Sequence, residues 1–168
     1  MLAAGVLLIY AVGLVVGGAI AFSMAPEGAN AKTALIVPGA CAALIALLAI
    51  GVAAARKKGL KRGLHIAALA LMLVFGAAFS QRAMAASGSV QAHRNAAAQL
   101  EAAIESGEVA DTPEARAAFF EREGAADHDK SYLANTLWGL VVFSALMFFV
   151  GLVVHPGRRV VRAMKTQS

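Results

Sequence analysis

Charge is almost absent from long stretches of this chain. Four runs, at about residues 2–25, 34–55, 64–83 and 133–154, hold no acidic residue, and Arg82 is the single Lys or Arg in any of them. About 20 consecutive apolar residues suffice to cross the hydrocarbon core of a bilayer. A typical soluble domain is nearer half apolar than the 60% found here. The sequence therefore predicts an all-α fold, an integral membrane bundle of four helices.

The chain also has few of the residue patterns that carry chemistry. Cys41 is its single cysteine, so no internal disulfide forms, and it has neither a glycine-rich phosphate loop nor a His-Glu metalloprotease spacing. His93 and His128 lack a third metal ligand at a diagnostic spacing. No acidic or basic side chain lies near the middle of a predicted span, where a proton or ion relay needs one. We therefore expect no enzymatic activity, no cofactor, no metal site and no electrogenic pump.

The charge that is present is divided between the two sides of a four-span topology. Five Lys or Arg lie within residues 56–62 and four more within 158–165, whereas nine of the ten acidic residues lie between 84 and 131. Loops rich in Lys and Arg stay on the cytoplasmic side. We therefore expect cytoplasmic N- and C-termini, with residues 84–131 on the opposite side. The net charge of +5 then reflects topology and does not indicate a nucleic-acid partner.

The first apolar run carries one feature of a secretory signal. Ser23-Met24-Ala25 resembles a small-x-small cleavage site. However, Pro26 follows directly, no Lys or Arg precedes the run, and the run is too long for the apolar part of a signal. We expect this segment to be retained as a membrane helix.

Glycine is the unusual residue of the first run. Gly13, Gly17 and Ala21 recur at every fourth position, and Gly18 lies beside them. Glycine costs roughly 1 kcal/mol relative to alanine in a helix interior, so such a row is favoured where helix backbones approach closely, as in membrane bundles. The row either packs against a helix, of this chain or of a partner, or leaves a groove for a lipid chain.

Polar residues near the end of the third run form a second candidate site. A helix that begins at Leu64 rises by roughly 27 Å before it reaches Arg82. This cluster, Ser80, Gln81 and Arg82, is therefore expected close to the far interface. Arg82 is either an anchor at the rim of the bundle or a docking point for the carboxylate of an amphiphile, because Arg pairs well with carboxylates. Tyr10 lies too deep for an interfacial aromatic belt, so we expect its hydroxyl to meet another helix.

The stretch between the third and fourth runs is the water-soluble part of the chain. It divides the sequence into residues 1–83 with three membrane helices, an acidic insertion at 84–131, and 132–168 with the fourth helix and a basic tail. Helical spacing within the insertion, and Thr112-Pro113-Glu114 as a helix start, predict a helical hairpin. An exposed pair, Phe119 and Phe120, would then contact a partner. A mobile acidic loop is the alternative.

Several features follow one another in an order found in a known family. Ile9-Tyr10 leads into Gly17-Gly18-Ala19-Ile20, Lys32-Thr33-Ala34-Leu35-Ile36 opens a small-residue second helix, a short basic turn follows, and Val74-Phe75-Gly76 precedes Phe79 and Arg82. This part of the chain resembles the transmembrane protein 14 family, which is related to plastid fatty-acid exporters. The insertion at 84–131 departs from the short turn usual in that family. The resemblance implies a compact four-helix membrane protein connected with the movement of hydrophobic carboxylates or porphyrin-like molecules, without catalytic residues.

Two functions remain open. The first, suggested by the resemblance, is passage of an amphiphile such as a fatty acid through or along the glycine-lined bundle. The second is a structural role as an accessory subunit of a larger membrane complex, packing through small-residue helix faces and the insertion. The expected partners are membrane lipids and either other membrane subunits or further copies of this chain.

Overall fold

The computed structural model of this chain describes residues 2–26, 32–125 and 129–154. In these residues the chain forms five α-helices and no strand: α1 (Leu2–Ser23), α2 (Lys32–Ala54), α3 (Lys58–Glu105), α4 (Pro113–Arg122) and α5 (Ser131–Val153). Four of them, α1, α2, α3 and α5, are long and apolar enough to cross a membrane. The predicted all-α fold with four such helices is confirmed. The basic tail and His128 lie outside the described residues.

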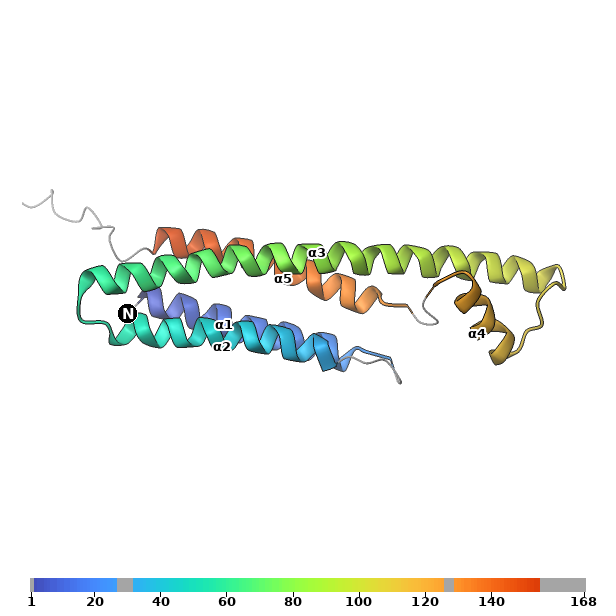
Figure 1. The fold of residues 1–168 in the computed structure, drawn as a ribbon, viewed down its shortest axis with the longest axis horizontal. Helices are drawn as coiled ribbons and strands as arrows, with labels where there is room; N and C mark the ends of the chain where they lie inside the picture. Colours follow the sequence, from blue (N-terminus) through green and yellow to red (C-terminus); the bar gives the residue numbers. More distant parts are fainter. Residues whose placement is uncertain (1, 27–31, 126–128, 155–168) are drawn as a thin grey trace, which may run out of the picture.

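The four long helices pack as two pairs (Figure 1). α1 lies along α2, and α3 lies along α5, while α1 also contacts α5 and α2 contacts α3. Large side chains from all four helices fill the centre and are fully buried or nearly so, among them Leu7, Tyr10, Ile45, Met72 and Phe79. Many large apolar side chains instead point outward and are exposed. Such a surface suits contact with lipid, because in water it would be an interaction or aggregation site.

α3 is much longer than a bilayer crossing requires. Its 48 residues extend for about 72 Å at 1.5 Å per residue, whereas a hydrocarbon core is about 30 Å thick. We refer to residues 84–105 as the α3 extension. The helix continues without a break past residue 83, so the third apolar run and the first part of the insertion belong to one helix. No proline interrupts it there, and its buried positions continue through Ala83, Ala86 and Val90.

α4 folds back against the α3 extension (Figure 1). Gly107 has a φ of 78°, a left-handed conformation that glycine adopts readily and that turns the chain away from α3. The hydroxyl of Thr112 accepts a hydrogen bond from the backbone N–H of Ala115 at 3.3 Å, and Pro113 follows as the first helical residue. The helix start predicted at Thr112 is therefore confirmed.

The expectation that α4 exposes its phenylalanines was wrong. Phe119 is only 6% exposed, and the guanidinium of Arg122 lies 4.7 Å from the centre of its ring. Phe120 is half-buried and stacks on His93 of α3 with 5.0 Å between ring centres. A ten-residue helix is marginal alone and depends on tertiary packing, to which the stack of Phe120 on His93 contributes.

Candidate functional site

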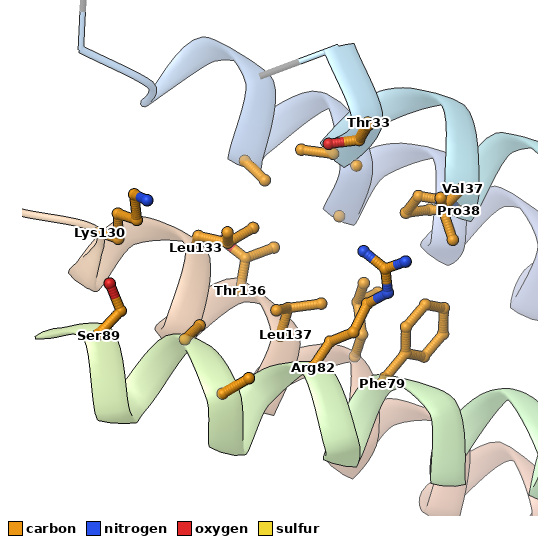
Figure 2. Close-up of a pocket in the computed structure, with 17 residues that line it drawn as sticks. Thr33, Val37, Pro38, Phe79, Arg82, Ser89, Lys130, Leu133, Thr136 and Leu137 are labelled. Carbon is orange, nitrogen blue, oxygen red and sulfur yellow. The ribbon is translucent and has the colours of Figure 1, made fainter. Parts of the chain in front are cut away.

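A cavity of about 300 Å³ lies between the two helix pairs, near the point where the α3 extension leaves the bundle (Figure 2). We call it the pocket. Its volume is at the lower end of the range of about 300–1,000 Å³ typical of small-molecule sites. All four long helices line it, mostly with apolar or small side chains. Its polar lining consists of Thr33, Arg82, Ser89, Lys130 and Thr136.

The glycine row of α1 contacts two different helices. Gly13 and Gly17 face α5: a Cβ added to Gly13 would collide with the Phe143 ring, and one added to Gly17 would lie 2.6 Å from Cδ2 of Leu140. Gly18 faces α2, where an added Cβ would lie 3.0 Å from the carbonyl oxygen of Ala34. The row therefore lets α1 approach two neighbours within its own chain.

Part of the same row also lines the pocket. Gly17, Gly18 and Ala21 form a wall of it, and small side chains from α2 and α3 line it as well. The two interpretations left open by the sequence, close helix packing and a groove, thus apply to neighbouring parts of one row.

Arg82 brings a cation to these apolar walls. Its guanidinium points from α3 across the pocket, toward Val37 and Pro38 of α2, with the ring of Phe79 beside it (Figure 2). The ion pairs that form among the described residues lie in and beside α4 and do not include Arg82. The first acid along α3, Glu101, is about 28 Å away at 1.5 Å per residue. The pocket therefore combines an apolar interior with an arginine that makes no ion pair within the described part of the chain.

The other two residues predicted with Arg82 do not reach the pocket lining. The hydroxyl of Ser80 donates a hydrogen bond to the Gly76 carbonyl at 2.9 Å, within its own helix. Gln81 is exposed. Of that cluster, Arg82 alone belongs to the candidate site.

Sequence reasoning missed Lys130, the second cation of the pocket. It comes directly before α5 and is half-buried, and Figure 2 shows it with Ser89 at the end of the pocket away from Phe79. The sequence could have indicated this position. Lys130 lies just before the fourth apolar run and Arg82 lies at the end of the third, so both are expected near the same interface. The pocket thus has one cation at its mouth and one beside its apolar walls.

Asp129 helps to set the start of α5 beside Lys130. Its carboxylate accepts a hydrogen bond from the backbone N–H of Ser131 at 2.8 Å. This bond lowers the pKa of the Asp129 carboxyl below its ordinary value. A carboxylate at a helix N-terminus also interacts favourably with the helix dipole.

A buried polar chain links α1 to α5 below the pocket. The hydroxyls of Tyr10 and Ser144 are 2.8 Å apart, and Ser144 donates to the Leu140 carbonyl at 2.7 Å. Since the one hydroxyl hydrogen of Ser144 is used in that bond, Tyr10 is the donor to Ser144. The prediction that the Tyr10 hydroxyl meets another helix is confirmed. The ring of Tyr10 also stacks on Phe143, with 5.6 Å between ring centres.

A second buried contact holds the opposite end of the α3–α5 pair. Nε2 of His65 donates a hydrogen bond to the Gly151 carbonyl at 3.0 Å, and the His65 side chain is fully buried. That carbonyl lies in the last turn of α5, where carbonyls lack partners within the helix. The contact joins residues 86 positions apart, which no local pattern reveals.

A second hollow, of about 400 Å³, lies along the contact between α1 and α5. We call it the groove. It is lined by residues of these two helices alone: Gly13, Val16, Gly17, Ile20, Asn135, Thr136, Gly139, Leu140 and Phe143. Val16, Ile20 and Gly139 are exposed, so the groove opens on the outer face of the bundle.

The described part of the chain contains no group of three His, Cys, Asp or Glu side chains arranged to hold a metal ion. Compared with known proteins, the chain matches no protein-family model, no curated protein and no solved structure. The resemblance to the transmembrane protein 14 family therefore stays a prediction.

Proposed function

We propose that this chain is a non-enzymatic, multi-pass membrane protein that binds an anionic amphiphile in the pocket and moves it across the membrane. A fatty acid or a similar hydrophobic carboxylate is the ligand class. The observation that carries the proposal is the pairing of Arg82, which makes no ion pair among the described residues, with apolar walls. An amphiphile has the same division between a charged head and an apolar chain.

The depth of each group supports this ligand class. Arg82 is about 27 Å along α3 from Leu64, so in a membrane it would lie near one interface. Phe79 lies about one turn deeper than Arg82 along α3, and Pro38 and Leu137 lie more than one turn beyond the first residues of α2 and α5. A carboxylate would then remain near the headgroups while its chain points toward the hydrocarbon core.

The orientation follows from the basic residues. The turn between α2 and α3, at residues 55–57, and the start of α3 carry Arg56, Lys57, Lys58, Lys61 and Arg62. By the positive-inside rule this end faces the cytoplasm. The pocket and the α3 extension would then lie toward the opposite side.

The accessory-subunit hypothesis has less support. It relied on small-residue faces and on Phe119 and Phe120 as contacts for another protein. Gly13, Gly17 and Gly18 pack against helices of this chain, and Phe119 is buried. These residues are therefore occupied within the chain.

Ligand binding by the purified protein in lipid nanodiscs tests the proposal. Arg82→Gln should weaken octanoate binding by about tenfold or more, the usual size of a lost charge-assisted hydrogen bond. Arg62→Gln is the matched control, because Arg62 is also an exposed arginine of α3 but lies far from the pocket. Transfer of the acid across reconstituted vesicles should fall in the same variant. Equal binding by the two variants would remove the basis of the proposal.

A further inference from the structure

The pocket is small for the ligand class proposed above. At about 300 Å³ it reaches only the lower end of the range for small-molecule sites. It has room for a carboxylate and the first part of an apolar chain. A long chain must continue into another space.

The groove is the adjoining space. Gly17, Thr136 and Leu140 belong to the linings of both hollows. The two spaces are therefore separated by a single layer of side chains at the α1–α5 contact. The groove is lined mainly by apolar or small residues, including Val16, Ile20 and Gly139.

One side chain makes up most of this separating layer. Leu140 lies directly over Gly17, since a Cβ on Gly17 would be 2.6 Å from Cδ2 and 3.3 Å from Cγ of Leu140. On the α1 side of this contact there is only backbone. A change of rotamer at Leu140 would join the pocket to the groove, because Leu140 and Gly17 line both hollows and Gly17 has no side chain.

We infer that Leu140 is a gate between the pocket and the groove. When it swings aside, the chain of a long amphiphile crosses over Gly17 and lies in the groove, while the anionic head stays at Arg82. The inference rests on the proposed function and adds to it a preference for long apolar chains and a route toward the lipid. Thr136 is the third shared residue. Its hydroxyl donates a hydrogen bond to the Tyr132 carbonyl at 2.8 Å, so its methyl group is left to contact the acyl chain.

Filling the groove separates this inference from the proposed function. A Cβ added to Gly139 meets nothing within 4 Å, and Gly139 lines the groove but not the pocket. Gly139→Leu should therefore occupy the groove without disturbing the binding of the head. Gly39→Leu is the matched control, because Gly39 of α2 also has open space at its Cβ and lines neither hollow.

Octanoate and palmitate are the probes, measured with the full chain in nanodiscs of one lipid composition. Gly139→Leu should weaken palmitate binding severalfold, because the displaced part of the chain loses its packing contacts with the groove, and should leave octanoate binding unchanged. Gly39→Leu should change neither. Partitioning of each acid into the bilayer is the same for every variant, so the comparison between variants reports the groove.

The outcomes of this experiment are distinct. If Gly139→Leu leaves palmitate binding unchanged, or weakens both acids equally, while Arg82→Gln weakens both, the gate is wrong and the proposed function stands. If Arg82→Gln has no effect on either acid, the proposed function fails and the gate with it.

A second measurement needs no variant and therefore no assumption about folding. A palmitate analogue with a photoreactive group at the end of its chain is bound to the unaltered protein, and its attachment sites are mapped by mass spectrometry. Labelling of Val16 or Ile20 that excess palmitate suppresses would support the gate. Suppressible labelling confined to pocket residues such as Val37 and Phe79 would overturn it.

Discussion

The same four helices form a closed half and an open half. In the closed half, toward the turn between α2 and α3, large side chains such as Leu7, Val52 and Met72 are fully buried or nearly so, and His65 binds the Gly151 carbonyl. In the open half, small residues such as Gly18 and Ala21 leave the pocket. The open half also carries the polar lining of the pocket, including Arg82 and Lys130, whereas the closed half is filled by apolar side chains around His65.

The largest expected effect comes from opening a cavity at the centre of the bundle. Tyr10 is fully buried and links α1 to Ser144. Tyr10→Ala should lower the free energy of unfolding by about 3–5 kcal/mol, measured by denaturant titration in detergent. Ile9→Ala is the control, because Ile9 is the neighbouring residue and is 60% exposed. Similar losses in the two variants would show that the centre is not tightly packed.

The contact between His65 and Gly151 should rank second. His65→Ala removes the donor and leaves a buried carbonyl in the last turn of α5 without its partner. We expect a loss of about 2–3 kcal/mol in the free energy of unfolding. Amide exchange should rise first in the last turn of α5. An increase in amide exchange confined to α1 and α2 would contradict the conclusion that this contact joins α3 to α5.

One substitution made in each half compares the two directly. Ala68 and Ala85 both lie on α3, but Ala68 is fully buried while Ala85 is exposed and lines the pocket. Ala68→Leu should cost about 1–3 kcal/mol through overpacking. Ala85→Leu should change the free energy of unfolding by less than about 0.5 kcal/mol and yet reduce octanoate binding. Equal costs would mean that the pocket closes by repacking.

The smallest effect concerns pH and belongs to the open half alone. The bond from Ser131 N–H lowers the pKa of the folded-state Asp129 carboxyl, so the carboxylate stabilises the start of α5 above its unfolded-state pKa. This contribution declines as the pH falls below about 4 and is lost as the pH passes through the lowered pKa. Amide exchange in the first turn of α5 should rise over this range, and Asp129→Ala should abolish the change. The amides near Gly151 are the control and should not respond.

Local signals in the sequence were sufficient for part of this structure. Long uncharged runs predicted the four long helices, the Thr112-Pro113 pair predicted the start of α4, and the depth of Tyr10 predicted a polar partner on another helix. Each of these conclusions depends on composition or on neighbouring residues. The continuity of α3 through residue 83 was not predicted, because a change from apolar to polar residues does not by itself show whether a helix ends.

The candidate site needed information that the sequence does not carry. Gly17 and Arg82 were identified separately, but only the fold places them on one pocket. In an amphipathic helix the apolar stripe shows which face is buried. The four membrane runs are apolar on every face, so their sequences do not show which face points into the bundle. The rotation of each helix is then set by packing, such as that of Gly17 on Leu140 and of Gly18 on Ala34. The burial of Phe119 was missed because it depends on tertiary packing and not on neighbouring residues.

The unbroken length of α3 has a mechanical consequence. Arg82 and Glu105 are separated by about 35 Å of continuous helix at 1.5 Å per residue. If α3 tilts as a rod by about 5° at the pocket, its far end travels about 3 Å at that length. α4, attached by Phe119 and Phe120, moves with it. A small tilt at the pocket would therefore become a larger displacement at the far end of α3, and a spectroscopic probe on the exposed Ser106 would report it.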